Sequence, residues 1–324
     1  MDEERNSELI RGSEVIPKEI DWLWYPYIPI GKITTIQGDP GEGKSTFALN
    51  LAALVTRGEA FPFSDDAIEP MNVIYQNTED DLDDTVIPRF IKAGGDTERI
   101  YFIDESNNPL TFSDVDRIEN AIRECDAKLI IFDPLVSYIG ESVSMNNANE
   151  VRAQFNKLIQ IAKQNKCAIL IVGHMNKMQG VKAMYRAVGS IDVVAAARSC
   201  LLIGTYDDPD NRVMAVQKCN LAEKGAAIRF EIIDGNVNWI DVMDITADEL
   251  LNSCSSLSGN KSTSKMETAK DCLVDWLSEG AKPQQEVIEK FNEMGISRRT
   301  AENAKKELGI RSVKQKDHWT WQLS

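Results

Sequence analysis

The sequence predicts an α/β fold, in which a mostly parallel sheet carries helices on both faces and an antiparallel extension at one edge, with a small domain at the C-terminus. Three observations support this prediction. Apolar runs alternate with helical patterns over the first half of the chain. A glycine-rich sequence of the phosphate-binding type follows the first of these runs. A serine-rich stretch, 251–265, then sets residues 266–324 apart.

The alternating part of the chain predicts five parallel strands and four helices. Strands are expected at 33–37, 73–77, 100–103, 129–132 and 168–172. Helices are expected at 46–57, 80–93, 114–125 and 148–165. Later runs with short turns between them, at 199–205, 213–219, 228–233 and 236–240, predict the antiparallel strands at the edge. The aromatic-rich segment 22–27 is expected to pack against this domain or against a neighbouring subunit.

The phosphate-binding sequence has the pattern G-x-x-x-x-G-K-[ST] and lies between a strand and a helix. Its residues are Gly38, Asp39, Pro40, Gly41, Glu42, Gly43, Lys44 and Ser45, with Thr46 next in the helix. The glycines let the backbone wrap a phosphate with its N–H groups pointing inward, and the helix N-terminus adds a positive dipole end. Lys44 is expected to reach the β- and γ-phosphates, and the Ser45 hydroxyl to hold Mg²⁺. The chain is therefore expected to bind a nucleoside triphosphate.

Two carboxylates are expected beside this loop. Asp133 ends the buried run 129–132 in the Walker B arrangement and is expected to hold the Mg²⁺ shell. The next residue is Pro134, so a catalytic acid has to come from elsewhere. Glu79 follows the strand 73–77 and is the favoured general base, which would orient the attacking water. The competing acids at 80 and 81 are expected to open the following helix, where negative charge suits the helix dipole.

Further polar residues follow the strand 168–172. His174, in the sequence GHMNK, is interpreted as a sensor of the γ-phosphate, with a capped histidine at a strand end as the alternative. The long loop 175–189 carries Lys177, Lys182 and Arg186. Long loops inside compact domains are usually functional, and this one is expected to grip nucleic-acid phosphates in the channel of a ring. A solvated surface loop is the alternative.

Two basic residues belong to the antiparallel part of the sheet. Arg198 and Lys218 lie at or inside its strands, where an unpaired charge is costly. One interpretation is that they project from a subunit edge toward the γ-phosphate bound by a neighbour, as an arginine finger does. The alternative is an internal salt bridge to one of the many acids of the chain.

Residues 266–324 are expected to form a helix-turn-helix domain with a wing. Helices are predicted at 269–277, 286–294 and 298–308, the last capped by Ser297, and a hairpin at 311–314 and 319–323. The third helix leaves basic side chains near the surface, namely Arg298, Arg299, Lys305 and Lys306. Contact with duplex DNA is the favoured interpretation, and a winged helix that binds protein is the alternative.

Bulk composition narrows the class of protein. The net charge of −15 argues against a general coat of nucleic acid but allows a local basic surface. Six scattered cysteines without a C-x-x-C pair fit thiols in a reducing cytosol. With two histidines, a His-based zinc site is not expected. Since neither a long apolar run nor a secretory signal is found, the expected location is cytoplasmic, without membrane contact.

Together these motifs resemble RepA-type ATPases of the RecA-like P-loop superfamily, which include a plasmid-encoded hexameric replicative helicase and many phage-type AAA proteins. The resemblance rests on GDPGEGKST, NTED, LIIFDP, GHMNK and the step from Gly189-Ser190 to Arg198, and it covers about 22–240. It implies ATP and Mg²⁺ as cofactors. The implied roles are phosphate and Mg²⁺ binding by Lys44, Ser45 and Thr46, Mg²⁺ binding by Asp133, base catalysis by Glu79, γ-phosphate sensing by His174 and action between subunits by Arg198 and Lys218.

The resemblance further implies a homo-hexamer that moves the loop 175–189 along single-stranded DNA, as a helicase or translocase in phage, plasmid or mobile-element replication. The C-terminal domain departs from the plasmid helicase. Because of this domain, three alternative functions are also considered: a replication initiator, a helicase loader, or a recombination or regulatory ATPase that does not separate DNA strands. The expected domains are an N-terminal segment (1–29), the ATPase domain (30–250), a flexible linker (251–265) and the winged-helix-like domain (266–324).

Overall fold

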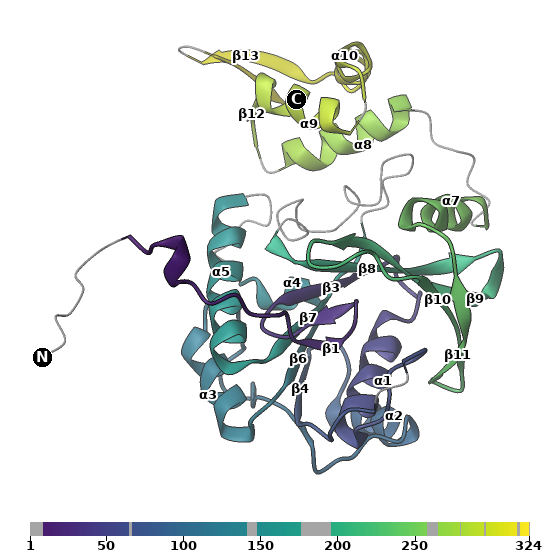
Figure 1. The fold of residues 1–324 in the computed structure, drawn as a ribbon. Helices are drawn as coiled ribbons and strands as arrows, with labels where there is room; N and C mark the ends of the chain where they lie inside the picture. Colours follow the sequence, from purple (N-terminus) through teal and green to yellow (C-terminus); the bar gives the residue numbers. More distant parts are fainter. Residues whose placement is uncertain are drawn as a thin grey trace, which may run out of the picture.

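A computed structural model describes residues 9–64, 67–140, 148–175, 196–257, 265–278, 280–294, 296–315 and 318–323 of the chain. Within these ranges the strands form a nine-stranded sheet, a two-stranded sheet near the N-terminus and a three-stranded sheet near the C-terminus. Figure 1 shows the large sheet between helices, which is the layered arrangement that the sequence predicts.

The nine-stranded sheet has the strand order β11-β10-β9-β8-β3-β7-β6-β4-β5. Its strands are β3 (Ile33–Gln37), β4 (Val73–Asn77), β5 (Ile100–Tyr101), β6 (Leu129–Asp133), β7 (Ala168–Val172), β8 (Ser199–Tyr206), β9 (Asp208–Cys219), β10 (Ala227–Ile233) and β11 (Asn236–Met243). Neighbours from β8 to β5 are parallel, whereas β8, β9, β10 and β11 pair antiparallel in sequence order. The predicted parallel sheet with an antiparallel edge extension is confirmed.

Helices cover both faces of this sheet because its central strands are apolar on both sides. In β6, Leu129 and Ile131 belong to one buried cluster and Ile130 and Phe132 to the other. Such strands are continuous apolar runs in the sequence. The helical elements of this part are α1 (Lys44–Arg57), the π-helical turn η2 (Leu82–Val86), α2 (Ile87–Lys92), α3 (Val115–Cys125), α4 (Leu135–Tyr138), α5 (Ala148–Asn165) and α7 (Ala247–Leu257).

Two predicted elements are shorter than expected because side chains take up backbone groups. Asn77 Oδ1 accepts the N–H groups of Glu79 and Asp80, each at 2.8 Å, and regular helix begins only with η2 and α2 instead of at residue 80. Likewise, the side-chain amide of Gln76 accepts from the Ile103 N–H and donates to the Ile103 carbonyl, so β5 ends at Tyr101 rather than at 103. Local side-chain bonds of this kind compete with regular structure.

The expected linker 251–265 is partly wrong, since its first residues belong to α7. Leu250 and Leu251 are buried against Leu202, Val213 and Ala215 of the antiparallel strands. This packing holds the serine-rich end of α7 in a helix, because tertiary contacts outweigh the modest helix propensity of serine. Of the expected linker, residues 258–264 lie outside the described part of the chain.

The C-terminal elements have their own buried cluster, which includes Leu273, Phe291 and Trp321. The elements are α8 (Lys265–Ser278), β12 (Lys282–Pro283), α9 (Gln284–Glu293), α10 (Arg298–Glu307), β13 (Arg311–Gln315) and β14 (His318–Gln322), and the strands pair in the order β12-β14-β13. The predicted cap is present, since Ser297 accepts a hydrogen bond from the N–H of Thr300 at 3.2 Å. The short strand β12 was not expected from the sequence.

In the described part of the N-terminal segment, a 3₁₀ turn, η1 (Gly12–Glu14), precedes the pair β1 (Trp22–Trp24) and β2 (Ile28–Pro29). Trp24 is buried and stacks on Phe61 with ring centroids 5.2 Å apart. The aromatic segment therefore packs against the domain of its own chain, one of the two expected arrangements. Among the described helices, none combines the length and the apolar character needed to cross a membrane.

Candidate nucleotide-binding site

The predicted phosphate-binding loop joins the carboxyl end of β3 to the start of α1. Gly41 and Gly43 adopt left-handed backbone conformations with φ of 85° and 81°, which residues with a side chain rarely take. A Cβ on Gly38 would lie 2.3 Å from the carbonyl oxygen of Ile203, a backbone atom, so a side chain there would force the backbone to shift. The fold therefore requires the glycines that define the motif.

Lys44 lies under this loop and is almost fully buried, with 4% of its surface exposed. Its Nζ donates to the carbonyl of Asp39 at 2.8 Å, so the ammonium is held inside the curve of the loop. Burial lowers the pKa of Lys44, and the charge of Asp133 is the largest effect that opposes this shift. The lysine is thus placed to meet the anionic oxygens of a phosphate chain.

Asp133 stands at the end of β6, opposite Asn77 of β4 in the sheet register. It is 2% exposed, and the Tyr75 hydroxyl donates to its Oδ2 at 2.9 Å. Burial raises the pKa of Asp133, whereas hydrogen bonds from Ser45 and Tyr75 lower it. Ser45 and Asp133 are thus in contact, and their hydroxyl and carboxylate oxygens are the hard ligands that suit Mg²⁺. Tyr75, which orients the carboxylate, was not singled out from the sequence.

Glu79 lies on the turn that follows β4 and is exposed. Its charge acts on Lys44, Asp133 and His174, so it lies near all three. The neighbouring Asp80 forms an ion pair with Arg89 at 2.9 Å. Asp80 also lines a small cavity with Ser45 and Tyr75, so both acids lie near the loop and the assignment of Glu79 as the base stays a prediction.

His174 follows β7 and is half-buried. Its Nδ1 is buried and has no hydrogen-bond partner within the described residues. Burial and the charge of Lys44 lower the pKa of His174.

Gln37, the last residue of β3, also lies at this end of the sheet, and the sequence analysis does not identify it. Its amide lies 3.3 Å from the position of a Cβ on Gly173, and both amide atoms are buried without a partner in the described ranges.

Arg198 and Lys218 lie at the other end of the sheet. The N–H of Arg198 donates to the Ile33 carbonyl at 3.0 Å, which places Arg198 at the amino end of β3. The phosphate-binding loop follows the carboxyl end of that strand, roughly 15 Å away at 3.3 Å per residue. Lys218 pairs with Cys200 and donates to the Ala197 carbonyl at 2.8 Å, and burial lowers the pKa of its amine. Neither residue is positioned to reach the loop of its own chain.

The alternative of an internal salt bridge is not seen for Arg198, which is exposed and has no ion pair among the described residues. The basic residues of the loop 175–189, namely Lys177, Lys182 and Arg186, lie outside the described part of the chain.

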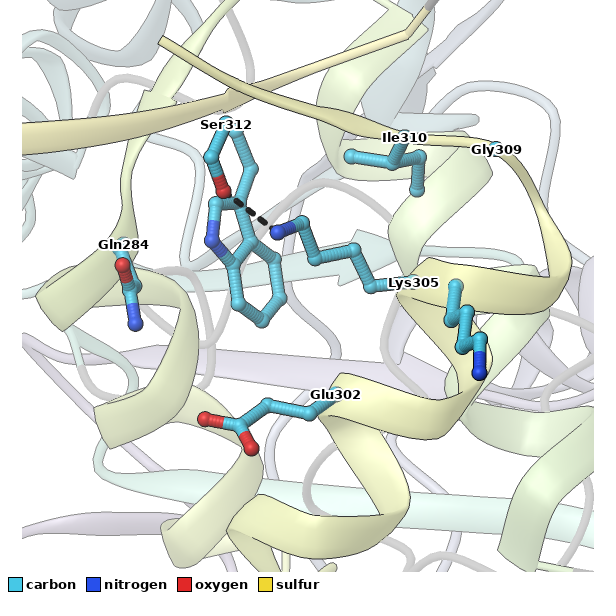
Figure 2. Close-up of a pocket in the computed structure, with 8 residues that line it drawn as sticks. Gln284, Glu302, Lys305, Gly309, Ile310 and Ser312 are labelled. Atoms are coloured by element: carbon cyan, nitrogen blue, oxygen red, sulfur yellow. Dashed lines mark hydrogen bonds between the residues drawn. The ribbon is translucent and has the colours of Figure 1, made fainter. Parts of the chain in front are cut away.

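The basic residues of α10 differ in their surroundings. Arg299 and Lys306 are exposed, and Arg298 forms an ion pair with Glu302 at 2.8 Å. The expectation that Lys305 lies near the surface is wrong. This residue is half-buried, donates to Ser312 and lies over the Trp321 ring at 5.0 Å from its centroid. Figure 2 shows the hydrogen bond from Lys305 to Ser312. Both residues line a pocket of about 500 Å³.

Comparison with known proteins identifies related sequences. The family described as "AAA domain" matches residues 2–180, which is more than half of the chain. "DNA repair protein RadA" of Halalkalibacterium halodurans is 29% identical over 179 residues, which are 54% of this chain and 35% of that protein. The protein of the same name from Streptococcus pneumoniae is 29% identical over 147 residues, 45% of this chain and 31% of the relative. The similarity thus spans about a third of the length of these relatives.

Proposed function

The chain belongs to the AAA domain family and has a RecA-like P-loop core, and from this premise we propose that it hydrolyses ATP with Mg²⁺ while acting on DNA. One observation carries the proposal. The carboxyl ends of three parallel strands, β3, β4 and β6, bring together a buried lysine, a hydroxyl and carboxylate pair suited to Mg²⁺, and a carboxylate on the turn after β4. These groups are Lys44, Ser45 with Asp133, and Glu79. Phosphoryl transfer needs a positioned phosphate chain, charge neutralisation and an oriented water, which such a set supplies.

Each residue has a role in this proposal. Lys44 and the loop N–H groups bind the phosphates, and bound Mg²⁺ would supply the positive charge that neutralises them. Ser45 and Asp133 would hold the metal, with Asp133 oriented by Tyr75. Glu79 orients the attacking water and His174 faces the γ-phosphate. ATP and Mg²⁺ are accordingly the proposed cofactors.

DNA is proposed as the partner because the relatives are named DNA repair proteins. The finer proposal is a homo-hexameric helicase or translocase on single-stranded DNA, of the RepA type, that serves phage, plasmid or mobile-element replication. The likeness to RadA favours a second candidate, a RecA-like recombination or repair ATPase that does not separate strands. A replication initiator or helicase loader remains the third candidate.

ATP hydrolysis by the purified chain, measured with and without single-stranded DNA, tests this proposal. We expect Mg²⁺-dependent turnover that rises at least about tenfold with DNA, since enzymes that move on DNA couple the two. Lys44→Ala is the matched control and should abolish turnover. The mass in solution with a non-hydrolysable ATP analogue reports assembly. A ring-sized mass with DNA stimulation supports the translocase, whereas DNA-indifferent turnover in a monomer contradicts it.

For the C-terminal segment we propose a winged-helix domain that contacts duplex DNA through α10. Its three helices followed by the β13–β14 hairpin have the order of a helix-turn-helix with a wing. The two exposed basic residues of α10 that have no ion pair in the described ranges, Arg299 and Lys306, are the candidate phosphate contacts.

Arg299→Ala/Lys306→Ala in the full chain is expected to weaken duplex binding by about tenfold. It should also reduce the slope of the logarithm of the affinity against the logarithm of the salt concentration by about two, because each phosphate contact releases roughly one counterion. Fluorescence anisotropy at several salt concentrations measures both quantities. Lys92→Ala/Lys224→Ala removes the same charge from exposed positions of the ATPase part and serves as the control. Equal losses of duplex affinity in the two double variants would indicate non-specific attraction by the charge of the whole chain and would contradict a binding site on α10.

A further inference from the structure

The antiparallel strands present side chains to the phosphate-binding loop. Arg212 of β9 pairs with Thr205 of β8 and with Phe230 of β10, and directly paired residues of antiparallel strands point to the same face of the sheet. Phe230 packs against Phe47 of α1 with ring centroids 5.2 Å apart. Arg212 therefore points to the face that carries α1 and the loop from which α1 begins.

Contacts place these side chains directly against the loop. Thr205 Oγ1 donates to Oε2 of Glu42 at 2.6 Å. A Cβ built on Gly43 would lie 2.2 Å from Cδ1 of Ile232 and 3.6 Å from Nε of Arg212. The guanidinium of Arg212 therefore lies beside the glycine that precedes Lys44.

The donors of Arg212 are only partly used. Its Nε is buried and has no hydrogen-bond partner in the described part of the chain. One terminal nitrogen donates to the Asp210 carbonyl at 3.4 Å, at the long limit of a hydrogen bond. A guanidinium stays charged at every accessible pH and presents five donors in a planar fork that matches phosphate oxygens. A cation with unused donors beside a phosphate-binding loop is suited to an anionic ligand.

We propose that Arg212 is a nucleotide-binding residue, whose guanidinium contacts the phosphates of the nucleoside triphosphate held by the loop of the same chain. It differs in this from Arg198, which lies at the opposite end of the sheet. The proposal rests on the proposed binding of ATP at this loop. It extends the site from the parallel strands to β9, because the contact comes from the antiparallel extension.

The test measures the Kd for ATP with Mg²⁺ in the full chain, for the wild type, Arg212→Gln and Arg212→Lys. The matched control is Arg229→Gln, which removes an arginine of β10 that forms an ion pair with Asp241 on the adjacent strand β11. We expect Arg212→Gln to weaken ATP binding by at least about tenfold, as loss of a charge-assisted contact does, and Arg212→Lys to recover part of it. Arg229→Gln should bind like the wild type.

The unfolding temperature without nucleotide separates binding from folding, and it should be unchanged in Arg212→Gln. An ATP affinity of Arg212→Gln within twofold of the wild type would overturn the proposal. So would a loss of affinity that accompanies a lower unfolding temperature and is not recovered by Arg212→Lys. If the wild type itself does not bind ATP, the proposed function fails, which is distinguishable from failure of the Arg212 contact alone.

Discussion

Glu79→Gln is expected to keep ATP binding and to lower turnover by about 100-fold or more, the usual contribution of a general base. The reason is geometric. Glu79 follows β4 on a turn that the Asn77 side chain holds, and its charge acts on Lys44 and Asp133 across the site. Glutamine keeps the size of the side chain but does not accept the proton of the attacking water. Steady-state hydrolysis and binding of a fluorescent ATP analogue, measured on the same preparation, check the two halves of this expectation.

Asp80→Asn is the control, because Asp80 is the adjacent acid and is engaged with Arg89. It should retain most of the turnover. Should Asp80→Asn lose activity while Glu79→Gln keeps it, the base assignment would pass to Asp80. Weak ATP binding by Glu79→Gln would instead indicate that Glu79 supports the site and not the chemical step.

Arg198→Ala is expected to lower turnover by about 1,000-fold, the lower range for loss of an arginine finger, while each chain still binds ATP. Arg198 is exposed and lies at the amino end of β3, away from the loop of its own chain. We therefore expect its effect on hydrolysis to be exerted on the nucleotide of a neighbour. Arg152→Ala, which removes an exposed arginine of α5, controls for charge and should be without effect.

Mixing Arg198→Ala with Glu79→Gln chains tests this action between subunits. At equal amounts, roughly one interface in four joins an intact base to an intact arginine if subunits associate at random. Turnover of the mixture should then rise to about a quarter of the wild-type value, although neither variant is active alone. If activity stays at the level of the single variants at every ratio, both residues act within one chain or Arg198 has a structural role.

The sequence predicts the parallel part of the sheet closely because strands buried on both faces are unbroken apolar runs. The ends of β3, β4 and β7 agree with the predicted residues for this reason. Where a side chain binds backbone groups, as Gln76 does at Ile103, the observed end of a strand differs from the predicted end. The pattern of apolar residues in the sequence does not reveal such a hydrogen bond. The helix α7 extends into a serine-rich stretch because of its burial against other strands, which is a tertiary effect.

The residues of the site also fall into those that the sequence identifies and those that only the fold brings together. The phosphate-binding loop is contiguous in the chain, and its glycines are set by backbone geometry, so the sequence alone identifies it. Tyr75 and Arg212 reach the site from separate strands, and only the sheet register brings them there. Lys305 shows the converse case. Helical spacing places it near the surface, but the fold turns its amine toward Trp321.

If Arg198 completes the site of a neighbour, the separation of the phosphate-binding loop and Arg198 along β3 has a consequence for assembly symmetry. One end of the sheet carries the phosphate-binding loop and the other end carries Arg198. A contact that joins them pairs unlike surfaces of two identical chains. Such head-to-tail contacts exclude a two-fold symmetric dimer as the unit with complete sites, and they repeat until the rotation between neighbours closes a ring or leaves an open helical filament. In an open filament one terminal chain always has an incomplete site, whereas in a closed ring every site is complete.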